Sequence, residues 1–429
     1  MAVGEQAVRP CRSRLRFVTR FGAPEAIALA VALIAASVGW KSGVDRVGID
    51  FYQQPWAVPA AQRLAPEADV WDPAARRRMA KVLNDQVDAR KLHVAPPERQ
   101  RRAARSTHHG REAALAVVGT PFFFATLAPF AGIDYEQDAR RYYRVIFGLF
   151  GLGVGLLAWL AGLSLSAGLM LYAGLVVWFE PLVSEFRVWN VNCILLTLLA
   201  VAAALLRARK VALAGALLAL GVCFKPMLLP IPVVLAFCWL ATSRFRDVWR
   251  LAVGGTGGAV FAVLVGIAWA RSWGAWQSFA HGLDITGPAY ASSLGNFAIG
   301  RWLLDNTGAM HTGFISAALL VLVSAALFLR RLALRRAGPA DAVGARSDSV
   351  DDLVILGLGV LVMTLLSPLI WLHYFVLLCV PIVACLAPGR PSEPTPAVFG
   401  RLALGVFVLL LFSWWGPLYD IAKGFGAAK

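Results

Sequence analysis

Four groups of polar residues interrupt or border long apolar stretches. A segment that only faced lipid would carry apolar side chains, so these polar groups are candidates for function. The first contains Asp50, ten residues after the apolar run Pro24–Trp40. A carboxylate held just above a bilayer can act as a general base toward a hydroxyl group. A solvated loop carboxylate without any catalytic role is the competing interpretation.

The second group is the segment Glu180–Asn192, in which charges, a tryptophan and two asparagines crowd a tight turn between apolar helices. The side chains of Asn190 and Asn192 each offer several hydrogen-bonding sites and could hold a sugar. They could equally satisfy the ends of helices, since asparagine is a good N-cap residue. Both interpretations remain open at this stage.

The third group is Lys225-Pro226, at the midpoint of the apolar segment Val211–Leu240. Basic clusters stand on both sides of that segment, at residues 207–210 and 244–250, and we place both clusters in the cytoplasm. The segment must then be a hairpin with Lys225 near its outer tip. An ammonium there is costly without a partner, which favours binding of a phosphate. The alternative is a lysine that snorkels to the headgroups.

The fourth group comprises the loop 271–311 and the turn 367–374. Arg301 in the loop could bind a phosphate through two parallel hydrogen bonds. His373 in the turn could donate to a leaving phosphate or to a sugar. A single arginine or histidine in such a segment is more often structural, so neither role follows from residue type alone.

The composition defines the elements that must position these groups. Of 429 residues, 59% are hydrophobic and only 15% are charged, and the mean hydropathy is +0.65. Repeated apolar runs of nearly 20 residues predict an all-α integral membrane protein and exclude soluble and disordered classes. We attribute the net charge of +16 to cationic loops beside anionic lipid, and not to nucleic-acid binding.

The chain divides into a cytoplasmic basic N-terminus (1–22), a first transmembrane helix (23–40), an outer loop (41–112) and a polytopic bundle (113–429). We expect about 11–13 transmembrane helices in all. The predicted helices lie near 24–40, 143–160, 165–183, 191–206, 211–224, 227–240, 251–270, 312–330, 353–371, 374–387 and 402–418.

The outer loop carries 14 Lys and Arg against nine Asp and Glu. Within it, Asp72–Lys91 has a narrow apolar stripe, which predicts an amphipathic helix on the membrane face. Ala113–Phe130 contains two prolines, and we expect it to be re-entrant or steeply tilted on the outer side.

Missing motifs narrow the chemistry. The absence of GxxxxGK[ST] disfavours ATP-driven transport within this chain, and the absence of HExxH and GxSxG removes the simplest intramembrane hydrolases. No DxD pair is present, which disfavours a nucleotide-sugar enzyme with a bound divalent ion. The six cysteines indicate neither a disulfide framework nor a zinc site.

Five motifs in order resemble those of glycosyltransferase family 87, a branch of the GT-C superfamily of membrane glycosyltransferases, over roughly residues 25–390. A GxDFxxY-like stretch matches Gly48–Tyr52, and a PPF…PL segment matches Thr120–Pro129. A GQxN motif matches Trp189–Asn192. The hairpin motif AGxLLxLxxxxKPxxLLxxP is matched by Ala214-Gly215 through Lys225-Pro226 and Pro230, and SPxxWxHxxV is matched by Ser367-Pro368, Trp371, His373 and Val376. The sequence departs from the family at Thr120, in place of proline, and at Trp189-Asn190, in place of Gly-Gln.

The resemblance implies a GT-C-like bundle that performs an inverting sugar transfer from a polyprenyl-phosphate sugar, without a cofactor or an obligatory metal. Asp50 would be the base, and Lys225, Arg301 and His373 would bind the donor phosphate. The residues implied to shape the sugar or acceptor pocket are Tyr52, Asn190, Asn192 and Trp371. The expected partners are the donor, a lipid-linked or glycan acceptor and membrane lipids.

The expected site faces the periplasm or exterior of a bacterial cytoplasmic (inner) membrane. The expected sugar is mannose, with a pentose such as arabinofuranose as the alternative. A lipid-linked-sugar transporter or flippase, or a non-catalytic member, remains open. An internal repeat would favour transport, and we find no convincing one.

Overall fold

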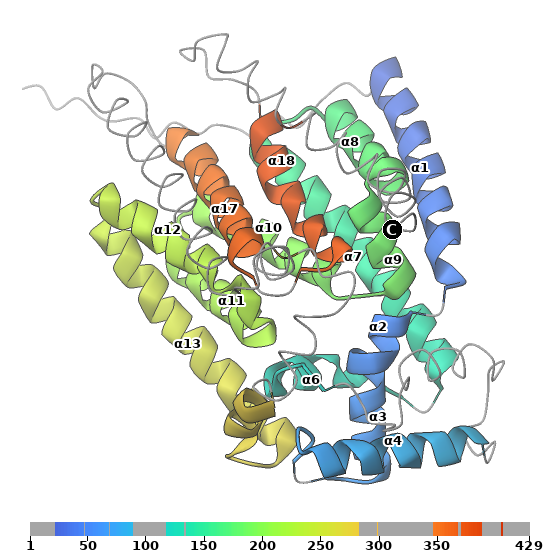
Figure 1. The fold of residues 1–429 in the computed structure, drawn as a ribbon. Coiled ribbons are helices and arrows are strands. Elements are labelled where there is room, and N and C mark those ends of the chain that lie inside the picture. Colours follow the sequence, from blue (N-terminus) through green and yellow to red (C-terminus); the bar gives the residue numbers. More distant parts are fainter. Residues whose placement is uncertain are drawn as a thin grey trace, which may run out of the picture.

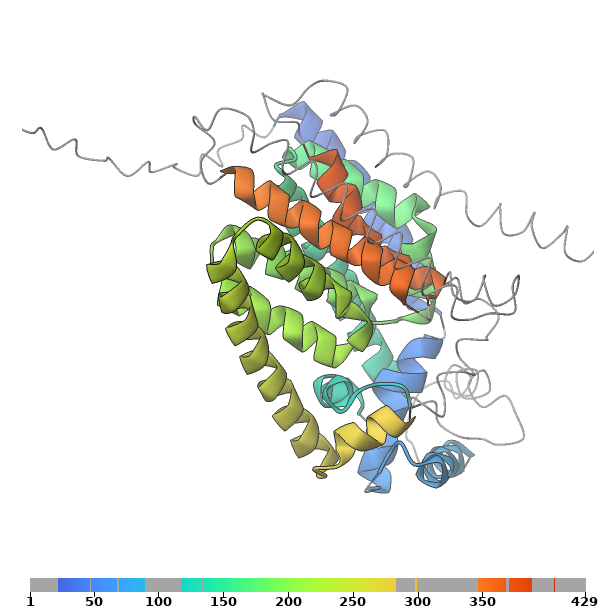
Figure 2. The same cartoon turned by 60° about the vertical axis from the view of Figure 1, so that its left-hand side comes forward.

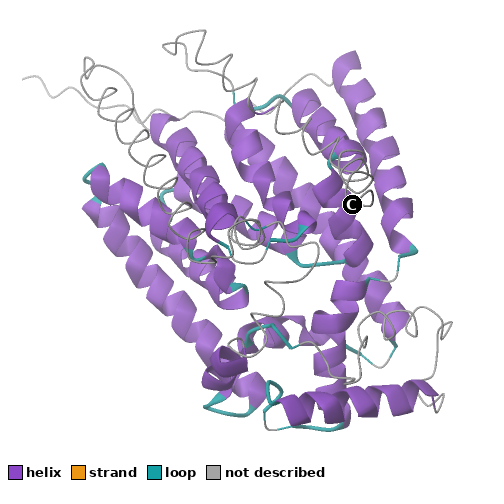
Figure 3. Ribbon diagram, in the orientation of Figure 1, coloured by secondary structure: helices purple, strands orange, loops and turns teal. Residues whose placement is uncertain are grey.

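The described part of the chain is a bundle of α-helices, and a computed structural model provides its coordinates (Figure 1). It covers residues 22–46, 48–67, 69–88, 117–132, 134–282, 346–367 and 370–387, together with Ala298 and Gly405. Within these residues there is no strand (Figure 3). The predicted all-α class is therefore confirmed. The expected helix near 312–330 lies outside the described residues, and so does the expected helix near 402–418 except for Gly405.

The main bundle is formed by helices that lie side by side (Figures 1 and 2). Its helices are α1 (Ala23–Val44), α7 (Tyr135–Ala161), α8 (Leu165–Trp178), α9 (Glu180–Val188), α10 (Asn192–Arg207), α11 (Val211–Phe224), α12 (Pro230–Ala241), α13 (Phe245–Ala270), α17 (Arg346–Leu366) and α18 (Cys379–Leu386). Among them, α10 packs against α7 and α11, and α17 packs against α12 and α18.

Three described helices, α1, α7 and α13, are long and apolar enough to cross a membrane. At 1.5 Å per residue, the 27 residues of α7 extend about 40 Å, which exceeds the roughly 30 Å of a bilayer core. Six further described helical segments are apolar but only 10–17 residues long. The protein is thus an all-α membrane protein, and the expected count of 11–13 spans stays a prediction.

The predicted helix 165–183 is broken, which corrects the sequence analysis. Helix α8 ends at Trp178, Phe179 is extended, and α9 continues at an angle of 65°. The cause is Pro181, which cannot donate a helical hydrogen bond in a helix interior but fits the first turn. The charged segment expected to be a turn is therefore mostly the helix α9, and the turn itself is only Trp189–Val191.

A layer of short helices covers one end of the bundle (Figure 1). It contains α2 (Ile49–Phe51), the π-helix η1 (Tyr52–Trp56), α3 (Ala57–Leu64), α4 (Pro73–Asp88), α6 (Pro121–Leu127) and the 3-10 turn η2 (Ala128–Phe130). Together α6 and η2 span ten residues, about 15 Å if fully α-helical, so they are too short to cross a bilayer.

Helix α4 confirms the helix predicted from Asp72, but its apolar stripe has a different partner. Met79 and Leu83 are fully buried in the core of the protein, and α4 packs against α3. The stripe predicted to face the membrane is thus occupied by protein. Periodicity shows that one helix face is apolar, but it does not distinguish a protein partner from a lipid one.

Small residues allow α11 and α13 to approach closely. A Cβ added to Gly254 would lie 1.8 Å from the carbonyl oxygen of Ala212, and one added to Gly258 would lie 2.4 Å from that of Ala216. Close backbone contact between small residues is a principal source of helix association in membranes. This contact holds the helix that ends beside Lys225.

We therefore expect Gly254→Ala to destabilise the protein, because α11 and α13 must separate to admit the methyl group. The expected cost is about 1–3 kcal/mol, the range for overpacking. The measurement is thermal unfolding of the purified protein in detergent. Gly257→Ala is the matched control, since a Cβ there meets nothing within 4 Å. Equal melting temperatures for the two variants would contradict this packing.

Candidate functional site

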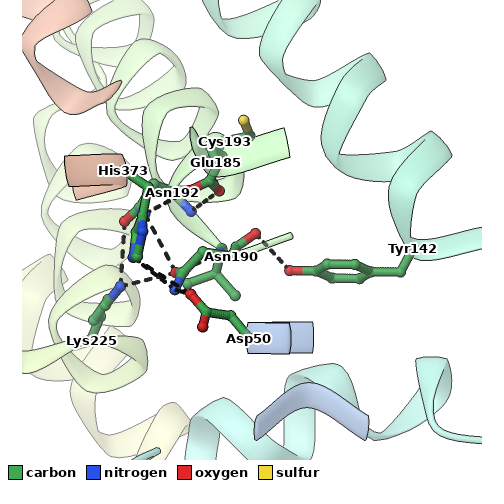
Figure 4. A network of polar contacts seen from close by, with 9 residues as sticks. Asp50, Tyr142, Glu185, Asn190, Asn192, Cys193, Lys225 and His373 are labelled. Atoms are coloured by element: carbon green, nitrogen blue, oxygen red, sulfur yellow. Dashed lines mark hydrogen bonds and ion pairs between the residues drawn. The ribbon is translucent and has the colours of Figure 1, made fainter. Parts of the chain in front are cut away.

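Five of the residues singled out in the sequence meet at the end of the bundle that faces the layer of short helices (Figure 4). They are Asp50, Asn190, Asn192, Lys225 and His373. They come from α2, the α9–α10 corner, the start of α10, the end of α11 and the 3-10 helix η4 (Leu372–Leu378). Segments separated by more than 300 residues thus converge on one polar cluster.

The side-chain amide of Asn190 is the centre of this cluster. Its Nδ2 donates to Asp50 Oδ2 at 2.6 Å and lies 3.1 Å from His373 Nε2. Its Oδ1 accepts from the backbone N–H of Val191 at 2.7 Å and from Lys225 Nζ at 3.3 Å. The amide therefore lies between the carboxylate and the ammonium, with its dipole aligned to both.

These contacts also assign the protonation of His373. Both Val191 N–H and the Lys225 ammonium are donors only, so the Asn190 atom facing them must be oxygen. The other end of the amide is then NH₂, and His373 Nε2 must accept from it. His373 is neutral in this arrangement, with its proton on Nδ1, and its Nε2 lone pair faces the cluster.

Lys225 is held by oxygens that carry no formal charge. Its Nζ donates at 3.3 Å to Oδ1 of both Asn190 and Asn192, and it lies 3.9 Å from the centroid of the Tyr374 ring. Such a cation–π contact favours an ammonium that is partly removed from water. Within the described residues Lys225 forms no ion pair, so its positive charge can be offered to an anionic ligand.

Asp50 combines burial with access. Its side chain is 23% exposed and stands 3.6 Å from His373 Nε2, measured from Oδ2. Burial raises the pKa of this carboxyl above its ordinary value, while the Asn190 hydrogen bond and the Lys225 charge oppose the rise. A carboxylate with a raised pKa is a stronger base, which suits it to remove a proton from a hydroxyl group.

Sequence reasoning did not select Glu185, although it supports the whole cluster. This carboxylate is fully buried and accepts from Asn192 N and Asn192 Nδ2, each at 2.8 Å, and from Cys193 N at 3.3 Å. It thereby satisfies backbone donors at the start of α10, which would otherwise lack partners. Its position seven residues before Asn192, in a short polar segment between two apolar helices, was the available signal, but Glu180 and Arg187 stand in the same segment.

Thr120 explains how the end of α11 is fixed. Its hydroxyl accepts from Phe123 N at 2.9 Å, which caps α6, and donates to the carbonyl of Cys223 at 2.6 Å. Proline could make neither contact through a side chain. The departure from the family motif at this position therefore links α6 to the backbone two residues before Lys225.

The other predicted site residues are placed differently. Tyr52 is fully buried and packs against Trp56 and Tyr135, with ring centroids 5.6 and 5.5 Å apart. Trp371 is partly buried against the small cluster that contains Ile370 and Tyr374. Arg301 lies outside the described residues. The roles expected for these three residues stay predictions.

Comparison with known protein families matches residues 118–368 to glycosyltransferase family 87. This match covers more than half of the chain and includes three of the five clustered residues, Asn190, Asn192 and Lys225. Asp50 and His373 themselves lie outside the matched range. No curated protein and no solved structure shows a significant match. Within the described residues, no group of three His, Cys, Asp or Glu side chains could hold a metal ion.

We predict that Glu185→Leu destabilises the protein by at least about 2 kcal/mol, because two backbone N–H groups and the Asn192 amide lose their acceptor. Thermal unfolding in detergent measures the effect. Glu180→Leu is the control on the same helix, since its ion pair with the half-exposed Arg187 is worth about 0–1 kcal/mol. A smaller loss at Glu185 than at Glu180 would refute the supporting role.

Proposed function

The chain belongs to glycosyltransferase family 87, and on this premise we propose that it transfers mannose from a polyprenyl phosphate to an envelope glycolipid or glycan. The observation that carries the proposal is the pair formed by Asp50 and Lys225, held apart by the amide of Asn190. Transfer from a sugar phosphate requires a base for the incoming hydroxyl and a cation for the departing phosphate, and this pair offers both.

In the proposed reaction, Asp50 removes the proton from the acceptor hydroxyl as the oxygen attacks the anomeric carbon. The new bond joins that oxygen to the sugar, and the bond between the anomeric carbon and the phosphate oxygen breaks. Within the described residues, Asp50 Oδ2 is engaged by Asn190, which leaves Oδ1 for the acceptor. The configuration at the anomeric carbon inverts, because base and leaving group act on opposite faces of the sugar.

Lys225 meets the negative charge of the leaving polyprenyl phosphate. Its present partners are two amide oxygens and an aromatic ring, and an anionic phosphate oxygen is a stronger acceptor than either amide. His373 lies beside the pair, and we assign it to the same phosphate, together with Arg301. As a neutral imidazole it would donate to that anion through its Nδ1–H, because its Nε2 accepts from Asn190. Because these groups would meet the charge directly, the proposal includes no cofactor and no obligatory metal.

The distribution of basic residues supports an outward-facing site. Helix α10 runs from Asn192 to Arg207, and α11 leads from Val211 to Lys225, so the basic residues 207–210 lie at the opposite helix ends from the cluster. Cationic segments favour the cytoplasmic side. We therefore propose that the cluster faces the periplasm or cell exterior of a bacterial inner membrane, with membrane lipids and the lipid-linked acceptor as its surroundings.

The test is transfer of radiolabelled mannose from polyprenyl-phosphate mannose by the purified protein, with a membrane lipid extract as acceptor source. We expect the wild type to form a labelled product and Asp50→Asn to lower the rate by about 10²- to 10⁴-fold, the range that general-base catalysis contributes. Asp45→Asn is the control, because Asp45 is exposed near the end of α1.

Binding of the donor should survive in Asp50→Asn, which separates loss of chemistry from loss of the site. A pentosyl donor is the second substrate to assay. Equal turnover by wild type and Asp50→Asn would contradict the role of Asp50. Movement of the donor across vesicle membranes without any product would favour the transporter.

The pH profile supplies an independent prediction. The base must be ionised, so kcat/KM should fall as the pH decreases through the pKa of Asp50, and burial places that fall above the ordinary range of an aspartate. Asn190→Leu keeps a side chain of similar size between Asp50 and Lys225 but removes the hydrogen bond that lowers this pKa, so the acid limb should move to higher pH. An acid limb at the same pH in both proteins would contradict the assignment of the base.

A further inference from the structure

Trp189 occupies a backbone conformation that a bulky residue rarely adopts. It ends α9 with φ of +57° and ψ of +55°, in the left-handed region. A left-handed conformation costs an L-residue about 1–2 kcal/mol, and glycine is the usual occupant. The family motif quoted above has glycine at this position. A tryptophan here must therefore make contacts that compensate for the strain.

Those contacts are made with the segment that leads to Asp50. The Trp189 side chain is fully buried, its Nε1 donates to the carbonyl of Gly43 at 3.2 Å, and its ring lies 6.3 Å from that of Phe51. On its other side, the ring lies 5.3 Å from that of Tyr143. The indole thus fills the space between the end of α1, helix α2 and helix α7.

Gly48 provides the space that the indole requires. A Cβ added to Gly48 would lie 2.2 Å from Cε3 of the Trp189 ring, so no other residue fits without displacing the indole. Gly48 also has φ of +63°, which favours glycine in its own right. Two left-handed backbone positions therefore face each other, and the tryptophan side chain of one fills the space left by the other.

This contact joins the two chain segments that carry Asp50 and its hydrogen-bond donor Asn190. Gly48 is the N-cap of α2, two residues before Asp50, and Trp189 directly precedes Asn190. Helix α7 supports both sides, since Tyr135 Oη donates to Gly48 O at 3.4 Å and Tyr142 Oη donates to Asn190 O at 3.0 Å. Any shift of the indole would move the backbone of Asp50 relative to that of Asn190.

We propose that Trp189, seated on Gly48, is a positioning residue that sets the distance between the Asp50 carboxylate and the Asn190 amide. It touches neither the sugar nor the phosphate. Its catalytic consequence rests on the proposed function, whereas its geometric consequence does not.

The geometric consequence can be measured without activity. Asp50→Cys and Asn190→Cys are introduced together, and the two thiols are linked with dibromobimane, which becomes fluorescent when it joins two neighbouring thiols. We expect efficient linking with Trp189 present and at least about a fivefold lower rate when Trp189→Gly is added. The unmodified chain, with its native cysteines, supplies the background. Equal linking rates would overturn the proposal.

The catalytic consequence is measured on the otherwise native chain. Trp189→Gly relieves the backbone strain but removes the indole, and a displacement of about 1 Å can lower a rate by about 100-fold. We therefore expect kcat to fall about 10- to 100-fold, with the donor KM changed less than about twofold. The acid limb of kcat/KM should also move to higher pH, because the Asn190 hydrogen bond to Asp50 weakens.

Trp189→Phe keeps a ring but loses the bond to Gly43, and it should retain more activity than Trp189→Gly. The control is Trp178→Phe, at a tryptophan that is 67% exposed at the end of α8. Unchanged kcat and an unchanged acid limb in Trp189→Gly would overturn the proposal. If the wild type transfers no sugar, the proposed function fails, and the linking experiment alone decides the role of Trp189.

Discussion

The separation of a carboxylate from an ammonium by one amide is the interaction on which the site depends. In an apolar bundle, Asp50 and Lys225 would gain most by pairing directly, and each would then be less available to a ligand. Asn190 prevents this, because its NH₂ group faces the acid and its oxygen faces the cation. Both charges are stabilised within the protein, yet neither is neutralised by the other.

Much of the surrounding structure serves to hold that amide in place. Glu185 satisfies the start of α10 and holds Asn192, which gives Lys225 its second amide oxygen. Thr120 ties α6 to the end of α11, and the glycines of α13 let that helix approach α11 closely. The site is thus formed at helix ends, where backbone donors and acceptors need partners, and the bundle fixes those ends relative to each other.

Hydropathy and the basic clusters were sufficient to predict the bundle and the hairpin with Lys225 at its tip. The length of an apolar run depends on the thickness of the membrane, and the basic residues at its ends depend on which side of the membrane they face. The same two patterns also predicted that Asp50, Asn190, Asn192 and His373 would share one side, since each follows or precedes an apolar run. The partners of these residues could not be predicted: Glu185 looked like one charge among several, and the role of Trp189 depends on a backbone angle. The prediction that the apolar face of α4 lies on the membrane was wrong for a related reason, because the sequence pattern shows that a face is apolar but not whether protein or lipid covers it.

The most direct test of the account is the structure of the Asp50→Asn variant with a bound polyprenyl-phosphate sugar, determined by cryo-electron microscopy with a bound antibody fragment. The account predicts that the phosphate lies within hydrogen-bonding distance of Lys225 Nζ, and that the sugar lies between it and residue 50. It also predicts that the Asn190 amide remains between these two residues. A donor phosphate bound away from Lys225, with the five-residue cluster unoccupied, would contradict the central claim.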